Sequence, residues 1–204
     1  MKMFGNITAH GVVYQLPEKP PSNLVWIDPK GHTNYWCSVV GDTSGSSSSP
    51  RTEGRQTLPD SGESYNWTVD GDVHAMWGIV RVELAPSSGK VIVGQLHAHK
   101  APNPFLMVTW WNGVARIDMR TTPTGTATKV LSVPCELGEA FDYELTVDSW
   151  GTLHIFLNGL TKTVQIDTAW NVYPFYFKAG AYVIDNVGPV TEGGWVVYEQ
   201  FDVI

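Results

Sequence analysis

The sequence of 204 residues is poor in cysteine and in positive charge, and it lacks long apolar runs. No apolar stretch approaches the roughly 18 residues of a membrane-spanning helix, so we expect a soluble protein with no membrane partner. Lys and Arg number 13 against 20 Asp and Glu, and the formal net charge is −7. Nucleic-acid-binding proteins are normally basic, so nucleic acid is excluded as a general partner, and any polyanionic ligand would need a local basic patch.

Two cysteines, Cys37 and Cys135, are present, and their spacing matches no metal motif. A disulfide and a pair of buried free thiols both remain open. Residues 1–16 contain no apolar stretch long enough for a signal peptide. We therefore expect that a signal has been removed or that the protein leaves its cell by another route.

The composition instead favours strands and turns. Hydrophobic residues make up 43% of the chain, which is enough for a large core, and 20 Gly, 13 Pro and 12% aromatic residues are typical of β-structure. We expect one domain, residues 1–204. Runs with strand character recur about every 8 to 12 residues, which predicts a sandwich or barrel. They are residues 35–40, 76–84, 90–97, 105–110, 114–119, 141–147, 153–157, 163–166, 175–183 and 195–201.

Short turn signals separate several of these runs. We interpret four of them as hairpin connections: Ser88-Gly89, Asn112-Gly113, Ser149-Trp150-Gly151 and Asn158-Gly159. The serine-rich segment 41–50 is expected to form a polar loop that leads into the strand beginning at Arg51.

Three segments far apart in the sequence carry polar groups on alternate residues: Arg51-Thr-Glu-Gly-Arg55, Gln95-Leu-His97 and Tyr176-Phe-Lys-Ala-Gly-Ala-Tyr182. Because side chains of a strand alternate between its two faces, each segment places its polar groups on one face. Burying them all without a ligand would cost several kcal/mol in unpaired polar groups. We therefore predict that they form the floor of an open, wet groove that holds an anion.

The three segments, in this order, resemble the signature regions of the alginate lyases of polysaccharide lyase family seven. Tyr-Phe-Lys-Ala-Gly-x-Tyr is the most specific of the three motifs, and the resemblance spans at least residues 51–182. It implies an all-β fold, a jelly-roll β-sandwich of two curved antiparallel sheets with a concave substrate cleft. It also implies β-elimination at the 1,4-glycosidic bond of a polyuronate in the endo mode, giving oligosaccharides with an unsaturated uronate at the non-reducing end.

The chemistry of these residue types suits that reaction. Arg51 and Gln95 can neutralise the uronate carboxylate, which makes the proton on C5 easier to remove. The resemblance implies that His97 is the base and that Tyr182 donates a proton to the departing oxygen. For mannuronate-type units it implies that tyrosine serves as both base and acid.

Further residues are assigned to substrate binding or to orienting the catalytic groups: Glu53, Arg55, Lys178 and His99. Tyr176 is interpreted as structural, and at most one of Trp110 and Trp111 can line the groove. The resemblance requires no metal and no cofactor. It implies an acidic polysaccharide partner, and we expect a monomer that is secreted or periplasmic.

The sequence departs from the family pattern at three positions. Gly54 stands where the family commonly has a larger apolar residue, and Leu96 stands where it has Ile or Val. The third is Ile184, which stands where the family commonly has Gln. The third bears on substrate contacts and leaves open a lyase that acts on glucuronan or an acidic exopolysaccharide. A non-catalytic carbohydrate-binding sandwich is the alternative from another class, although it would need no His97 and Tyr182 together. A glycosidase with paired carboxylates, such as Asp142 and Glu144, is a weaker third hypothesis.

Overall fold

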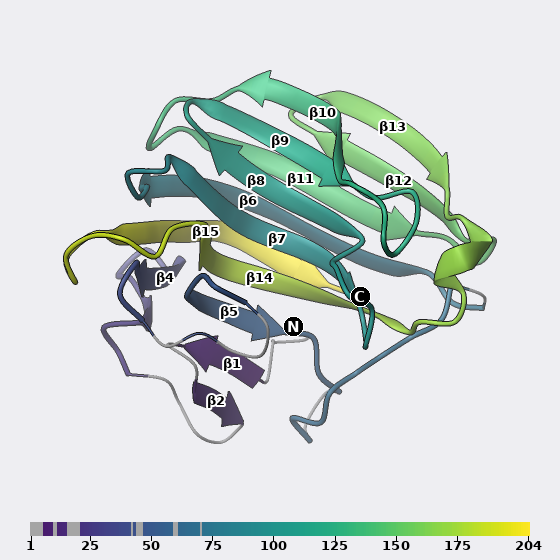
Figure 1. Ribbon diagram of the computed structural model, residues 1–204, viewed down its shortest axis with the longest axis horizontal. Helices are drawn as coiled ribbons and strands as arrows, with labels where there is room; N and C mark the ends of the chain where they lie inside the picture. Colours follow the sequence, from purple (N-terminus) through teal and green to yellow (C-terminus); the bar gives the residue numbers. More distant parts are fainter. Residues whose placement is uncertain are drawn as a thin grey trace.

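Two antiparallel β-sheets stack face to face in the computed structural model, which describes residues 6–9, 12–15, 21–41, 43, 47–58, 61–69 and 71–204 (Figure 1). The eight-stranded sheet has the order β10 (Thr128–Pro134), β9 (Val114–Met119), β8 (Leu106–Trp111), β7 (Lys90–Ala98), β14 (Phe175–Val183), β5 (Arg51–Arg55), β1 (Asn6–Ala9) and β2 (Val12–Gln15). The seven-stranded sheet has the order β13 (Leu160–Gln165), β12 (Thr152–Leu157), β11 (Ala140–Val147), β6 (His74–Leu84), β15 (Gly193–Val203), β4 (Thr33–Ser38) and β3 (Val25–Ile27).

Alternating apolar residues explain why these segments are strands. In β11, Phe141, Tyr143, Leu145 and Val147 are each at most 1% exposed, and the residues between them face outward. All ten strands predicted from the sequence are present, with ends shifted by a few residues. The strands β1, β2, β3 and β10 were not predicted. Of these, β10 lies at a sheet edge and has no buried residue, so it lacks the alternation that marks the others.

The Asn-Gly turns form hairpins as predicted. Asn112 and Gly113 have φ angles of 47° and 80°, and Asn158 and Gly159 have 44° and 82°, as type I′ turns require. The prediction of a hairpin at Ser88-Gly89 is wrong, because this turn joins β6 of one sheet to β7 of the other. A local turn signal reports that the chain reverses direction, but it does not report which sheet the next strand joins.

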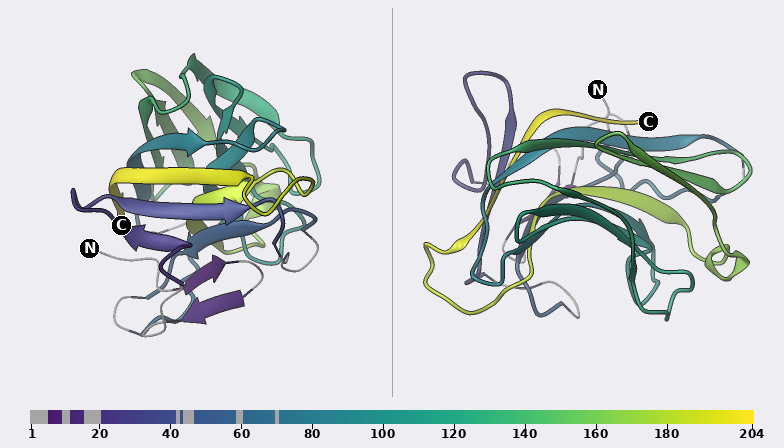
Figure 2. Two further views of the ribbon diagram at one scale, coloured as in Figure 1. Left: turned by 90° about the vertical axis from the view of Figure 1, so that its left-hand side faces the viewer. Right: turned by 90° about the horizontal axis from the view of Figure 1, so that it is seen from above.

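Both sheets curve in the same direction, and the eight-stranded sheet lies on the inside of the curve (Figure 2). The side chains on its core-facing side, including Leu96 and Phe177, pack against the other sheet and are 0% exposed. Burial of such side chains stabilises the fold by about 1.5–3 kcal/mol each. The other face of this sheet is concave and is not covered by the second sheet, and we call it the concave face. The predicted all-β, jelly-roll sandwich is confirmed.

The two cysteines are buried free thiols, so the second of the two possibilities left open by the sequence is the one observed. Burial raises the pKa of Cys37 to about 12 and that of Cys135 to about 11. Within the described residues, no helix is long and apolar enough to cross a membrane.

Candidate active site

The three polar segments lie on three neighbouring strands. In the eight-stranded sheet β14 sits between β7 and β5, so the last segment in the sequence joins the first two (Figure 1). Lys178 pairs with Arg55 on one side and with Gln95 on the other, while Tyr176 lies opposite His97 and Tyr182 opposite Arg51. The prediction that these segments converge is therefore supported by the register of the sheet.

Strand alternation places the polar groups on the concave face. Their neighbours, such as Leu96 and Ala179, point into the core. The departures at Gly54 and Leu96 both fall on buried positions.

Gly180 is required by the backbone at the centre of the site. Its φ is +147°, and a Cβ atom there would lie 2.4 Å from the carbonyl oxygen of Thr52 and 2.7 Å from Cα of Glu53. A side chain would therefore push β14 away from β5. The glycine of the Lys-Ala-Gly-Ala-Tyr segment allows the two strands to pair beside Glu53.

Glu53 lies at the centre of the hydrogen-bond network of the site. Its carboxylate is 0% exposed and accepts hydrogen bonds of 2.5 Å from Gln95 Nε2 and 2.5 Å from Lys178 Nζ. A guanidinium nitrogen of Arg51 lies 3.7 Å from the same carboxylate. Three groups from three strands thus converge on a single buried anion.

This network corrects the prediction of an open, wet floor. Gln95 and Lys178 are only 1% and 7% exposed, and they pair with Glu53 instead of with water. Burial by itself raises the pKa of Glu53, but attraction to Lys178 and Arg51 outweighs it, so the pKa is lowered and the group stays ionised. Polar groups that satisfy one another avoid most of the cost of burial. Of the two roles predicted for Glu53 and Lys178, orienting the catalytic groups fits this burial better than direct contact with sugar.

Arg51 and Tyr182 form a second contact group. The guanidinium carbon of Arg51 lies 4.0 Å from the centre of the Tyr182 ring, a cation–π contact that holds both side chains. The Tyr182 hydroxyl shares a hydrogen bond of 2.9 Å with Ser47 Oγ. Ser47, in the described part of the serine-rich segment, therefore lies beside the site. Ser47 itself was not singled out, because nothing in a run of four serines distinguishes one from the others.

His97 is stacked against Tyr176, with ring centres 5.2 Å apart. Nδ1 of His97 lies 3.0 Å from the carbonyl oxygen of Ala98. Because a carbonyl only accepts, the proton is on Nδ1, and Nε2 carries the lone pair. Burial, followed by repulsion from Lys178, lowers the pKa of His97 to about 4, so the ring is neutral at pH 7.

Tyr176 also supports Arg55, whose guanidinium carbon lies 3.4 Å from the tyrosine ring centre. Arg55 donates further hydrogen bonds to Ser64 (3.1 Å) and Asn66 (2.6 Å). The interpretation of Tyr176 as merely structural is therefore incomplete, since it joins His97 to Arg55. The residues Ser64 and Asn66 were missed, because no pattern in the sequence connects them to the segment that begins at Arg51.

His99 and the two tryptophans occupy the edges of this region. His99 follows the end of β7, and its backbone N–H donates to the carbonyl of Pro174. Burial and the nearby Arg55 lower its pKa. Trp110 is in the core at 5% exposure, whereas Trp111 is 38% exposed on the opposite face of β8. The prediction that at most one of them lines the concave face is confirmed.

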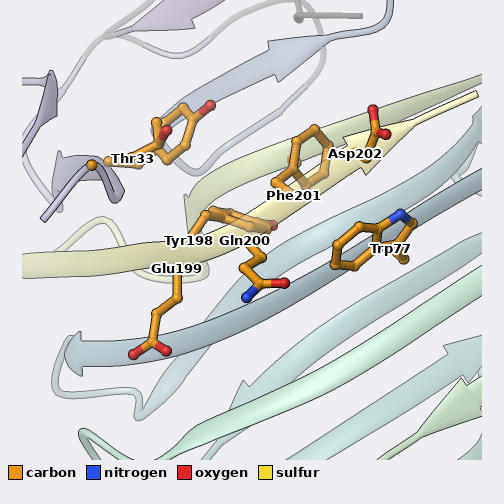
Figure 3. A pocket seen from close by; sticks show the side chains of 10 residues that line it. Thr33, Trp77, Tyr198, Glu199, Gln200, Phe201 and Asp202 are labelled. Carbon is orange, nitrogen blue, oxygen red and sulfur yellow. The ribbon is translucent and has the colours of Figure 1, made fainter. Parts of the chain in front are cut away.

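A cavity of about 420 Å³ lies away from this site (Figure 3). It is lined by residues of β4, β6 and β15, including Tyr35, Trp77, Tyr198 and Phe201, and it reaches Ala179 on the core side of β14. None of the predicted site residues lines it, so the site is defined by its polar network and not by this cavity.

The comparisons with known proteins agree with this geometry. The model of a family described as alginate lyase matches residues 20–204. This chain belongs to the alginate lyase family. It is therefore a polysaccharide lyase, and the predicted resemblance to polysaccharide lyase family seven is confirmed. Among curated proteins, none matches the chain in sequence.

Solved structures of alginate lyases match over most of the chain. An alginate lyase from Pseudomonas aeruginosa is 27% identical, with a TM-score of 0.84, and the match covers 98% of this chain and 96% of that one. Alginate lyase A1-II′, a member of polysaccharide lyase family seven, is 27% identical, with a TM-score of 0.80 and coverage of 91% and 84%. A variant of A1-II′ in complex with the substrate GGMG is 28% identical, with a TM-score of 0.79 and coverage of 91% and 82%.

Proposed function

We propose that this lyase cleaves alginate, or a closely related polyuronate, by β-elimination on the concave face of the eight-stranded sheet. The observation that carries the proposal is the register of β7, β14 and β5, which brings Arg51, Gln95, His97 and Tyr182 onto three neighbouring strands of the concave face, with Arg51 and Gln95 at the buried carboxylate of Glu53. The A1-II′ complexes with an oligosaccharide substrate and product support a polysaccharide partner.

Arg51 and Gln95 neutralise the substrate carboxylate. The Nε atom of Arg51 is buried and lacks a hydrogen-bond partner among the described residues, so a carboxylate bound in bidentate geometry would satisfy it. Gln95 donates one amide N–H to Glu53 and retains a second. Donors held in place before the reaction stabilise the negative charge that develops when the C5 proton leaves.

Nε2 of His97 takes the proton from C5 in the first part of the reaction. The C4–O bond then breaks, a double bond forms between C4 and C5, and Tyr182 gives its proton to the departing oxygen. No hydrogen bond joins His97 to Tyr182 among the described residues, so each group acts on the sugar separately. For mannuronate-type units, Tyr182 performs both proton transfers, and the Arg51 guanidinium carbon lies 4.0 Å from the centre of its ring.

The test is ultraviolet absorbance of the new double bond, which is conjugated to the carboxylate. Polymannuronate, polyguluronate and glucuronan are each mixed with the protein, with a heat-denatured sample as control. A rise in absorbance with one polymer establishes elimination and identifies the substrate. The departure from the family pattern at Ile184 leaves this choice of polyuronate open. No rise with any of them, together with binding of a polyuronate, would contradict the proposal and favour a binding module.

We also propose an endo mode of action, a monomer, and a secreted or periplasmic location. The support for an endo mode is that the concave face continues across neighbouring strands on either side of Tyr182, from Arg51 on β5 to Arg116 on β9. A fall in polymer viscosity that precedes the release of small products would establish the endo mode. Sedimentation gives the oligomeric state, and fractionation of the producing cell gives the location.

A further inference from the structure

A second polar cluster lies on the concave face outside the proposed active site. We call it the Trp111 cluster, and it consists of Lys90 on β7, Trp111 on β8, and Arg116 and Asp118 on β9. Lys90 Nζ lies 4.9 Å from the ring centre of Trp111, and the guanidinium carbon of Arg116 lies 5.1 Å from it. The exposed indole thus holds two cations near its ring.

A straight row of cross-strand neighbours connects this cluster to the active site. Tyr182 lies opposite Ile92, Ile92 opposite Thr109, and Thr109 opposite Arg116. Arg51 extends the row on the other side of Tyr182. At about 4.8 Å between strands, Arg116 lies some 14 Å from Tyr182 across the sheet. A polymer lying across the strands at Tyr182 therefore passes over the cluster.

The charge of the cluster is only partly neutralised. Arg116 is paired with Asp118 through Nε at 2.8 Å and through a second guanidinium nitrogen. Lys90 makes no ion pair among the described residues. Burial lowers the pKa of Lys90, and repulsion from Arg116 and Arg120 lowers it further, while Asp118 opposes them. An incoming carboxylate would relieve this repulsion.

Resting on the proposed function, we propose that the Trp111 cluster is a second carboxylate-binding position of the substrate groove. Lys90 pairs with the carboxylate of a uronate unit several sugars from the bond that is cleaved, and Trp111 holds Lys90 in place and forms the apolar wall beside the ring. The cluster thus adds binding energy for long chains and takes no part in bond cleavage.

The test compares Lys90→Gln and Trp111→Ala with the unmodified protein, on the polymer and on the shortest oligosaccharide that is cleaved. Loss of one charge-assisted contact should raise KM for the polymer about tenfold, with kcat within about twofold. The KM for the short oligosaccharide should not change. The salt dependence of the polymer KM should also weaken in Lys90→Gln, because one half-buried cation of the concave face is removed.

Lys162→Gln and Trp150→Ala are matched controls. Lys162 lies on β13 of the other sheet, and Trp150 is 84% exposed in the turn before β12. Neither should change KM, and all four variants should retain the melting temperature. Polymer cleavage by Lys90→Gln with an unchanged KM would overturn this inference alone. No cleavage of any polyuronate by the unmodified protein would overturn the proposed function and the inference with it.

Discussion

The two sheets are both antiparallel, but their strands carry opposite net charge. Strands of the eight-stranded sheet carry six of the 13 Lys and Arg residues and two acids, Glu53 and Asp118, both paired with cations. Strands of the seven-stranded sheet carry two cations, Arg81 and Lys162. Their acids are Glu83, Asp142, Glu144, Glu199 and Asp202. A protein with a net charge of −7 can therefore bind a polyanion, because its positive charge is gathered on one face.

The sheets also differ in how their ionic groups are packed. Glu53 is fully buried between Gln95 and Lys178, whereas Arg81 and its partner Glu83 on the other sheet have side chains 20% and 28% exposed. A buried network holds its members in one arrangement, and an exposed pair contributes little to stability. The difference shows that the polar groups of the concave face are organised before any substrate binds.

The largest expected effect is a loss of stability, and it tests the difference in burial between the two ionic groups. Glu53→Gln should lower the free energy of unfolding by about 3–5 kcal/mol, because Lys178 would be left as a buried cation without its partner. Glu83→Gln, the matched change on the other sheet, should cost less than about 1 kcal/mol. Urea denaturation of both variants measures the two values. Similar small losses would contradict the view that the concave face is held by its buried network.

The next largest effect is on catalytic activity, which should depend on residues of the eight-stranded sheet and not on those of the other sheet. His97→Ala and Tyr182→Phe should each reduce turnover by about a hundredfold or more, equivalent to at least about 2.7 kcal/mol in the activation barrier. His154→Ala is the control, because His154 is 50% exposed on β12 and pairs with Asp148. The rate of double-bond formation is the measurement. Near wild-type elimination by both site variants would refute the assigned roles.

Measured over one pH unit, the pH dependence of stability at His97 is the smallest of the three effects. The folded protein keeps this ring neutral down to about pH 4, whereas the unfolded chain takes up the proton near pH 6.5. The unfolded state therefore binds more protons between these values, and stability should fall as the pH drops, by about 1.4 kcal/mol per pH unit. His97→Gln should lack this contribution. Equal pH slopes for the two proteins, measured by urea denaturation, would show that the ring is not held neutral.

Much of the site was accessible from the sequence because strand alternation is a local rule. It places Arg51, Glu53 and Arg55 on one face and separates Trp110 from Trp111, and the structure agrees. Supporting residues such as Ser47 and Asn66 were not accessible, since they lie on irregular segments where no period relates one residue to the next. The edge strand β10 was missed for a similar reason, because it buries no apolar side chain.

By itself, the sequence determined most of the strands, the Asn-Gly hairpins and the residue types of the site, because each depends on neighbours in the chain. Only the tertiary structure decided that β14 lies between β7 and β5, and that Ser88-Gly89 carries the chain from one sheet to the other. It also decided that Glu53, Gln95 and Lys178 are buried together instead of facing water. These outcomes depend on which distant strands pair with each other and on how the sheet curves. Strand pairing and sheet curvature are decided by packing and ion pairing between residues that are far apart in the sequence.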